Sequence, residues 1–341
     1  MSLSNGNEKP WSKWHERLHK KLKTKSSLLP FGSSLLLSIS GGQDSMVLLK
    51  LILDLQRIYE WKLQIWHGDH GWHNSSKQIS QELEQWCKNQ EVTFFCDRTD
   101  KSSVSTEEAA RKWRYKKLIA QAKLISQLNP SLPCQHILTA HTGSDKAETL
   151  IMNLARGTYL GGLSSLKESR KMEGNIQLIR PMLSFSRQET IQICTEMNLP
   201  IWLDPSNNNK KFSRNRIRKE VLPVLEKLHS GSTIRIAQLA EKLSNLENDQ
   251  IQLTKLAIES LSQSNKINRV KISNLSLTAR SIILNQWFKE NQVPLLSAIQ
   301  LQELSQKITQ REPPGCIQLS QNWKVKWDKS FIEIIKPSSN Y

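Results

Sequence analysis

The sequence has few cysteines, and none of them stand in a C-x-x-C pair: five are scattered over 341 residues. This spacing excludes a disulfide framework and is typical of reduced thiols in a cytoplasmic protein. Long apolar runs are also missing, because none approaches the roughly 20 residues that span a bilayer. The basic N-terminal stretch has no apolar segment of the kind found in signal peptides. We therefore expect a cytoplasmic protein without membrane association.

Acidic residues are scarce relative to basic ones. The chain has 31 Asp and Glu against 48 Lys and Arg, which gives a formal net charge of +17. Such an excess suits a polyanionic partner, because Lys and Arg that neutralise phosphates release counterions. Charge alone leaves open a second interpretation, a basic surface that is merely solvated.

Short β-type runs alternate with helical stretches over the first 150 residues. This alternation predicts βαβ units and a parallel sheet, in which ligands bind at the carboxyl ends of the strands. The expected strands are 35–39, 63–67, 92–96 and 136–140, and the expected helices are 44–55, 75–89, 106–127 and one from 144 onward.

The pattern changes near Pro223 to Leu/Ile-periodic helices, and Pro313 to Ile335 indicates a terminal hairpin or two short strands. We expect an α/β fold in which a parallel-sheet domain is followed by a smaller, mainly helical domain. The expected parts are a basic N-terminal helix or extension (1–30), the sheet domain (31–225) and the helical domain (226–341), with the boundary near Leu222 to Ser232.

The segment from Ser40 to Ser45, of sequence SGGQDS, follows the first expected strand and opens the first helix. Two glycines let the backbone approach a phosphate closely, and helix N-terminal amides favour an anion. Asp44 beside phosphate is explained by a magnesium ion that bridges phosphate oxygens. No Gly-Lys-Ser/Thr follows, so this is not a Walker loop. The alternative is an ordinary strand–turn–helix with glycines in the turn.

Polar residues also follow the second and fourth expected strands. Asp69 and His70 end one strand, and His141 ends the other. Asp145 and Glu148 stand three apart at a helix start, so both face one side. Helix-start carboxylates favoured by the dipole are the alternative for this pair. For the histidines, a structural role is equally open.

The loop resembles the SGGxDS signature of the N-type ATP pyrophosphatase (PP-loop) superfamily. Further blocks resemble the tRNA(Ile)-lysidine synthetase family over about residues 33 to 225. In chain order the blocks are SGGQDS (40–45), HGDHG (67–71), EEAARKWRY (107–115), TAH with DKAET (139–149), RG with GGL (156–163), IRPML (179–183), and WLDPSN with RNRIR (202–218). Seven short blocks in the right order make the resemblance specific.

The resemblance implies a two-step reaction. ATP adenylates the carbon-2 oxygen of the wobble cytidine in a CAU-anticodon isoleucine tRNA, and the ε-amine of L-lysine then displaces AMP to give lysidine. The implied cofactors are ATP and Mg²⁺, and no obligatory protein partner is inferred. The implied catalytic residues are Asp44, Asp145, Glu148 and Arg111; the ATP-binding residues are Ser40, Gly41, Gly42, Gln43, Asp44, Ser45, Asp69, His70 and His141; the implied Mg²⁺ ligands are Asp44 and Asp145.

One block departs from the family's pattern. The usual block carries His-His and a double Asp, whereas here Thr142 follows His141 and Ser144 precedes Asp145. One potential carboxylate is therefore missing. This puts a role for the first acid in doubt, while Asp145 and Glu148 match the family's second Asp and its Glu.

A basic cluster without any acid lies between Ser206 and Lys219. Its position after the Asp-Pro-Ser-Asn block favours contact with the tRNA anticodon stem or the adenylate, although such a cluster can also be a solvated face or loop. The predicted tRNA-binding residues are Lys210, Lys211, Arg214, Arg216 and Arg218. The C-terminal domain is expected to recognise the tRNA, an assignment that rests mainly on the resemblance.

Two other functions compete with lysidine formation. A PP-loop tRNA thiolation enzyme generally needs a persulfide-carrying cysteine or cysteine ligands for an iron–sulfur cluster, and the absence of C-x-x-C disfavours it. A non-catalytic RNA-binding protein with a decayed loop is disfavoured because Ser40 to Ser45, Asp145 and Glu148 are all present.

Overall fold

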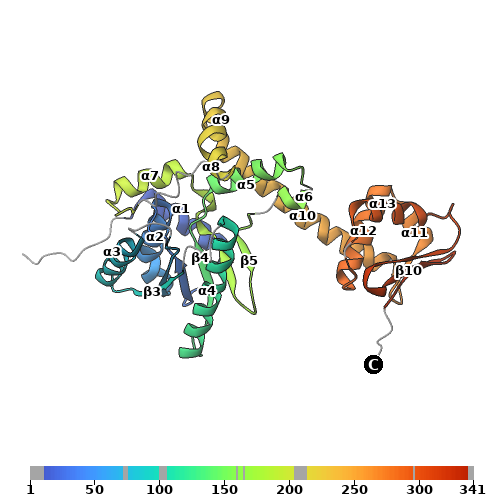
Figure 1. Ribbon diagram of the computed structural model, residues 1–341, viewed down its shortest axis with the longest axis horizontal. Helices are drawn as coiled ribbons and strands as arrows, with labels where there is room; N and C mark the ends of the chain where they lie inside the picture. Colours follow the sequence, from blue (N-terminus) through green and yellow to red (C-terminus); the bar gives the residue numbers. More distant parts are fainter. Residues whose placement is uncertain are drawn as a thin grey trace, which may run out of the picture. The chain divides into compact units, whose positions relative to one another are not determined.

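A computed structural model of the chain describes residues 11–71, 76–99, 106–158, 160–163, 166–202, 213–294 and 296–336. The chain divides into two compact units, Met1–Ser244 and Asn245–Tyr341, whose elements are labelled in Figure 1. Among the described residues, no helix is long and apolar enough to cross a membrane.

The first unit is built on a six-stranded sheet with the order β3-β2-β1-β4-β6-β5. All neighbours pair in parallel except β5, which runs antiparallel to β6 at the edge. The four strands expected from the sequence are confirmed, and the sheet is the predicted parallel one. The strands are β1 Ser34–Ser38, β2 Lys62–Asp69, β3 Thr93–Arg98, β4 Cys134–Thr139, β5 Ser169–Lys171 and β6 Gln177–Ile179.

Strand β1 lies in the middle of the sheet, and its leucines explain why. Leu35 and Leu37 point into one hydrophobic core and Leu36 into a second core on the opposite face, all with no exposed surface. A continuous apolar run is typical of a parallel strand covered on both faces. The loop that follows β1 is therefore held by the most deeply buried strand of the sheet.

Helices cover both faces of this sheet (Figure 1). The core that contains Leu35 and Leu37 also contains buried side chains of α1, α2, α3 and α7, whereas α4 packs on the core that contains Leu36. The helical elements of the unit are α1 Lys13–Thr24, α2 Gln43–Tyr59, α3 Ser76–Asn89, α4 Glu107–Leu128, α5 Gly143–Ala155, α6 Leu160–Leu163, η1 Pro181–Ser184, α7 Arg187–Glu196, α8 Ser213–Arg216, η3 Ile217–Val221 and α9 Leu222–Leu228, and α10 Ser232–Leu261 begins here.

Helix α1, expected as part of a separate N-terminal extension, packs against the main core. Trp14, Leu18 and Leu22 recur at helical spacing and are at most 5% exposed. The indole of Trp14 donates to Glu196 Oε2 of α7 at 2.6 Å. Burial of this apolar side fixes α1 to the sheet domain.

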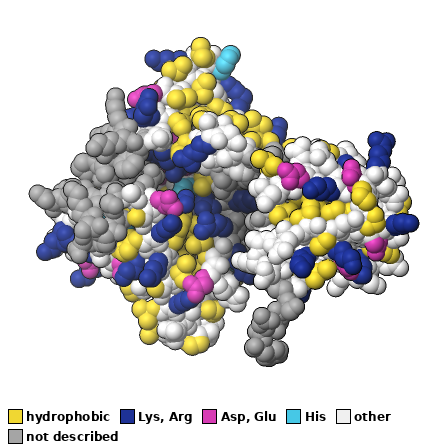
Figure 2. Space-filling model, turned by 45° about the vertical axis from the view of Figure 1, so that its right-hand side comes forward, with side chains coloured by type: hydrophobic (Ala, Val, Ile, Leu, Met, Phe, Trp, Pro, Cys, Tyr) yellow, Lys and Arg dark blue, Asp and Glu magenta, His cyan; other side chains and the backbone are white. Residues whose placement is uncertain are grey.

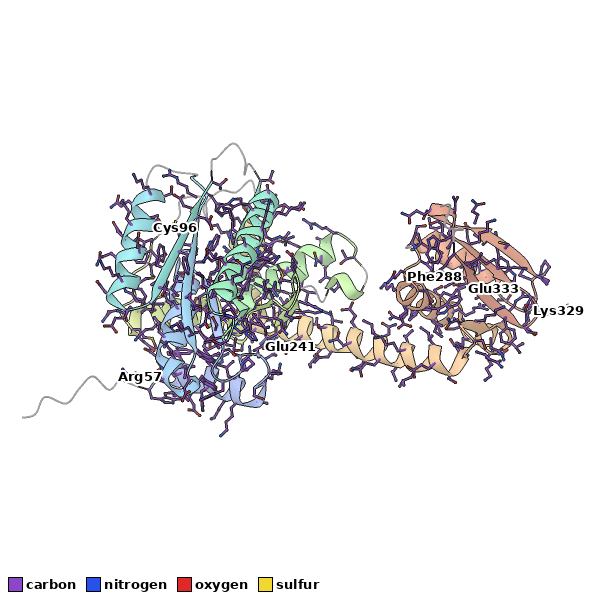
Figure 3. The ribbon with its side chains drawn as sticks, turned by 90° about the horizontal axis from the view of Figure 1, so that it is seen from below. Arg57, Cys96, Glu241, Phe288, Lys329 and Glu333 are labelled. Atoms are coloured by element: carbon purple, nitrogen blue, oxygen red, sulfur yellow. The ribbon has the colours of Figure 1, made fainter. Side chains whose placement is uncertain are left out.

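The compact units divide later in the chain than the expected boundary near Leu222 to Ser232, inside α10. Helix α9 and the first turns of α10 remain with the first unit. Ala237 and Ala240 are buried there, and Lys146 Nζ of α5 lies 3.3 Å from Glu241, which Figure 3 marks on α10. These contacts keep the start of α10 with the sheet unit, because a helix groups with the surface it packs on.

The second unit combines helices with a five-stranded sheet of order β7-β8-β11-β10-β9, and the strand pairs are antiparallel. Its core includes Trp287 and Phe288, the latter labelled in Figure 3. The sequence predicts only the last strands of this sheet. The elements are β7 Ser262–Gln263, β8 Lys266–Asn268, α11 Arg269–Ser273, α12 Leu277–Glu290, α13 Ala298–Lys307, β9 Gly315–Gln318, η4 Ser320–Asn322, β10 Lys324–Trp327 and β11 Phe331–Ile335.

Candidate functional site

The loop after β1 has the geometry of a phosphate cradle. Gly41 has φ +84°, a left-handed conformation that glycine adopts without strain. Gly42 is the N-cap residue of α2 and has no side chain to bond the first amides of the helix, while its own amide donates to Ser40 Oγ at 3.4 Å. Ser45 Oγ donates to the Gly42 carbonyl at 2.7 Å and lies 3.2 Å from Ser40 Oγ, which closes the turn. Free amides at a helix N-terminus bind anions, so the predicted phosphate site is formed locally by the loop itself.

Asp44 lies in the first turn of α2 and is hydrogen-bonded by residues of α7. Arg187 donates to Asp44 Oδ2 from Nη2 at 2.7 Å and from Nε at 3.2 Å. Thr190 Oγ1 donates to Asp44 Oδ1 at 2.5 Å. Both oxygens of the carboxylate are thus hydrogen-bonded by one neighbouring helix, which fixes their direction.

Asp145 lies on α5 after β4, and its two oxygens have different partners. Oδ2 accepts from the Thr142 amide at 2.8 Å and from Thr142 Oγ1 at 2.9 Å. Oδ1 accepts from Arg214 Nη2 at 3.0 Å. Burial raises the pKa of Asp145, but the guanidiniums of Arg214 and Arg187 outweigh it and hold the pKa below its ordinary value. Asp145 is therefore an ionised, oriented carboxylate.

Glu148 is one turn further along α5 and has no exposed side-chain surface. Arg214 Nε donates to it at 2.8 Å, and Arg218 donates from Nε at 2.6 Å and from Nη2 at 2.9 Å. A buried carboxylate needs such partners, because an uncompensated buried charge is costly. Asp145 and Glu148 share one helix face, as their spacing predicts, and the same two arginines contact both.

Asp69 and His70, at the end of β2, make contacts within the local turn and with neighbouring elements. Asp69 Oδ1 accepts from the Gly71 amide at 2.8 Å, and its Oδ2 lies 3.4 Å from Arg98 Nε. The ring of His70 packs edge-on to Trp113, with centroids 4.9 Å apart, and its Nε2 lies 3.4 Å from Arg114 Nη2. These contacts order the strand end, and nucleotide contact by Asp69 and His70 stays a prediction.

His141 lies between β4 and α5, near Asp145 in the chain. Its Nδ1 lies 3.0 Å from Thr139 Oγ1, and desolvation by burial lowers its pKa to about 3. The imidazole is therefore neutral at physiological pH, so it can offer a hydrogen bond to a nucleotide without adding charge.

Arg111, predicted to be catalytic, is exposed on α4. One turn on, Arg114 reaches toward His70, and its positive charge also lowers the pKa of His67 and of His141. The structure thus brings Arg114 to the strand ends, and a role for Arg111 in catalysis stays a prediction.

The predicted tRNA-binding arginines take different positions. Arg214 and Arg218 bind the carboxylates of α5, whereas Arg216 pairs at 3.0 Å with Glu220 on an exposed surface. Lys210 and Lys211 lie outside the described residues. Figure 2 shows Lys and Arg side chains spread over much of the visible face, in keeping with the +17 charge. RNA contact by this cluster stays a prediction.

Arg187 and Thr190 are functional candidates that sequence reasoning missed. They lie 143 and 146 positions from Asp44 in the chain. One local signal was present: Ser186 and Glu189 form a capping box, which marks a helix start directly after the IRPML block. That signal predicts the helix but not the residue it contacts.

Comparison with known proteins places this geometry in a family. Residues 13–225 match the PP-loop domain model, and residues 269–328 match the TilS substrate binding domain model. A tRNA(Ile)-lysidine synthase of Prochlorococcus marinus is 63% identical over 98% of this chain and 100% of its own length. The chain belongs to the tRNA(Ile)-lysidine synthase family.

The chain also matches a chloroplastic tRNA(Ile)-lysidine synthase. The chloroplastic protein of Pyropia yezoensis is 37% identical over 86% of this chain and 88% of its own length. Among solved structures, the U34-tRNA thiolase NcsA of Methanococcus maripaludis has a TM-score of 0.52 at 18% identity, covering 68% of this chain and 80% of that one. At that identity the likeness concerns the fold alone, which is the PP-loop fold predicted from the sequence.

The block that departs from the lysidine synthase pattern has clear local roles here. Thr142 is the N-cap of α5 and forms a capping box with Asp145. Ser144 Oγ accepts the amide hydrogen of Arg187 at 3.1 Å. Hydroxyls at these two positions therefore orient Asp145 and the first turn of α7, and no acid is needed for either task.

The donor set around Asp44 and Asp145 suits magnesium, which the PP-loop family implies. Both are carboxylates, and both lie within 4 Å of one cationic atom, Arg187 Nη2, at 2.7 and 3.9 Å. Among the described residues, no three His, Cys, Asp or Glu side chains gather into a metal-binding group. Magnesium in proteins is commonly bound through one or two carboxylates together with substrate phosphates and waters.

Proposed function

We propose that this chain ligates L-lysine to carbon 2 of the wobble cytidine in tRNA(Ile) with a CAU anticodon, forming lysidine and releasing AMP and pyrophosphate. The observation that carries the proposal is the uncapped N-terminus of α2, behind a left-handed Gly41, beside three carboxylates. Family membership with relatives named tRNA(Ile)-lysidine synthase supports the substrate and the product.

We assign phosphate binding to the loop from Ser40 to Ser45. Its amides would hydrogen-bond the triphosphate of ATP, and the helix dipole of α2 favours negative charge there. Asp69, His70 and His141 lie at neighbouring strand ends and would contact the rest of the nucleotide. The neutral imidazole of His141 is suited to a hydrogen bond with a sugar or base.

Asp44 and Asp145 would hold Mg²⁺, whose chemistry is to neutralise phosphate charge as pyrophosphate leaves. Neither carboxylate is suited to be a strong base, because each is hydrogen-bonded to arginine. Their own contribution is to fix the position of charge before substrates arrive.

The acids of α5 also suit the incoming lysine. Its ammonium group is attracted by carboxylates, so Asp145 and Glu148 would orient it toward the activated carbon. Glu148 can do so only if Arg214 or Arg218 moves, since both now contact it. Arg111 would neutralise charge that develops on the activated base.

The basic segment at 210–218 and the second unit would hold the tRNA. The predicted contacts are Lys210, Lys211, Arg214, Arg216 and Arg218. The match of residues 269–328 to a substrate binding domain supports a recognition role for the C-terminal part. We assign catalysis to about residues 31–225 and tRNA recognition to residues 226–341.

Thiolation of tRNA is a weaker alternative. Burial raises the pKa of Cys87 to about 12 and of Cys134 and Cys194 to about 11, so these thiols are poor nucleophiles. The remaining two, Cys96 and Cys316, are exposed and lie in different units. Free cysteines and a tRNA substrate both favour a cytoplasmic location. We infer no obligatory protein partner.

The test is reconstitution from purified components. The protein, ATP, Mg²⁺, L-lysine and a CAU isoleucine tRNA transcript should yield lysidine, detected by mass spectrometry of nucleosides, with one AMP per modified base. A transcript with uridine at the wobble position is the control and should stay unmodified. Release of ADP in place of AMP and pyrophosphate would overturn the assignment of the loop.

A further inference from the structure

Arg187 occupies the place between the two carboxylates that the proposed function gives to a metal ion. Its Nη2 lies 2.7 Å from Asp44 Oδ2 and 3.9 Å from Asp145 Oδ1. Asp44 and Asp145 come from different helices, α2 and α5, so one cationic atom joins two separate strand ends. Asp44 and Asp145 raise the pKa of Arg187 against the lowering effect of burial, so its charge is secure.

Hydrogen bonds to two neighbouring elements fix the backbone of Arg187. Its amide donates to Ser144 Oγ at 3.1 Å, and its carbonyl accepts from Gln43 Nε2 at 3.2 Å. These bonds tie the first turn of α7 to both the phosphate loop and α5. The side chain of Arg187 is 29% exposed, against 15% for Asp44 and 9% for Asp145, so it is the most solvent-accessible of the three.

Arg187 differs from the other two arginines of the site. Arg214 and Arg218 bind Glu148 as well as Asp145, and Glu148 is fully buried, so their positions are tied to the interior. The salt bridge to Asp44 comes from Arg187. Movement of this one side chain would free Oδ2 of Asp44 and remove one of the cations beside Asp145.

We propose that Arg187 is a placeholder cation: it holds Asp44 and Asp145 together while nucleotide is absent, and it passes to a phosphate oxygen when ATP arrives with its metal. The inference rests on the proposed function and deepens it by stating the order in which charges are exchanged. A guanidinium and a divalent ion cannot occupy the same position, so Arg187 keeps free metal out of the nucleotide-free site. An arginine also pairs well with phosphate, which gives the displaced side chain a partner.

Binding of Mn²⁺ to the nucleotide-free protein, followed by the electron paramagnetic resonance signal of free Mn²⁺, tests this without any turnover. Wild type should bind Mn²⁺ weakly. Arg187→Gln should bind it about tenfold more tightly or better, because loss of a charged hydrogen-bond partner leaves Asp44 open. Arg187→Gln combined with Asp44→Asn should lose the gain. Arg216→Gln is the matched control: Arg216 forms a salt bridge with exposed Glu220, so its loss should leave the Mn²⁺ affinity of the nucleotide-free protein at the wild-type value.

A second measurement does not depend on how an Arg187 variant folds. Asp44→Asn alone should leave nucleotide-free Mn²⁺ affinity unchanged, because Asp44 is already taken by the guanidinium. A lower affinity in this variant, or no gain in folded Arg187→Gln, would overturn the placeholder role. Lysidine formation by wild type is scored separately, so a failed Mn²⁺ prediction with intact lysidine synthesis rejects this inference and leaves the proposed function standing.

Discussion

Thr142 and Asp145 hold each other by three hydrogen bonds across the first turn of α5. The Thr142 amide and hydroxyl both donate to Asp145 Oδ2, and the Asp145 amide lies 3.4 Å from Thr142 Oγ1. One carboxylate oxygen is thereby committed to capping the helix, and only Oδ1 faces the arginines. Asp145 is consequently better suited to orienting a cation than to accepting a proton.

Thr142→Ala should cost about 1 kcal/mol in the free energy of unfolding, the usual effect of a lost N-cap, measured by urea denaturation. It should also slow lysidine formation, because Asp145 loses its orienting partner. Ser297→Ala is the matched control: Ser297 forms a capping box with Gln300 on α13, outside the catalytic cluster. Equal loss of rate in both variants would mean that Thr142 acts through stability alone.

Glu148→Gln should abolish lysidine formation and lower the free energy of unfolding by about 3–5 kcal/mol, since two guanidiniums lose a buried counter-charge. Thermal and urea unfolding measure the second effect. Glu220→Gln removes the partner of exposed Arg216, the same chemistry at the surface, and should leave stability unchanged. If Glu148→Gln unfolds as wild type does, the ion-pair cluster is not a structural element.

Gly41→Ala should raise the KM for ATP about tenfold or more, because misplaced amides no longer hydrogen-bond charged phosphates. The left-handed φ of +84° adds about 1–2 kcal/mol of strain, and the new Cβ would lie 3.3 Å from Trp202. Gly174→Ala is the control: its φ is +60° with nothing within 4 Å of the Cβ, so it shares the strain without touching the loop. Pyrophosphate release measures KM, and a normal KM for Gly41→Ala would contradict phosphate binding by the loop.

Stability should fall as pH drops from about 6.5, and His141 should account for part of the fall. Its pKa is lowered from 6.5 to about 3 in the folded protein, so below pH 6.5 the unfolded chain binds a proton that the folded chain does not. Urea denaturation between pH 4.5 and 7 should show a shallower dependence in His141→Gln. Exposed His229→Gln is the control, and the contribution of Asp145 falls below this window because its ordinary pKa is 3.8.

The parts of the site that the sequence predicts are those formed by near neighbours in the chain. Gly41 and Gly42 follow a buried strand, so their turn and the helix start are readable from spacing. Asp145 and Glu148 share a face because a helix repeats every 3.6 residues. The central parallel strands are readable for a similar reason, since each is a compact apolar run between turn residues.

The contacts across long chain separations could not be predicted in this way. Asp44 meets Arg187 over 143 positions, and Glu148 meets Arg218 over 70. A run of basic residues gives the sign of a charge but not its partner, so Arg214 and Arg218 suggest RNA as readily as carboxylates. The sheet of the second unit was foreseen only in part, because β7 and β8 have two and three residues and show no alternation.

Ser144 stands where the family's usual block carries an acid, and it accepts a backbone amide hydrogen from Arg187. With a hydroxyl at that position, the acids Asp44, Asp145 and Glu148 face the guanidiniums of Arg187, Arg214 and Arg218 in equal number. The cluster is therefore electrically neutral before any substrate arrives. The cluster therefore does not repel an approaching polyanionic nucleotide, and it has no net negative charge that would attract free divalent ions.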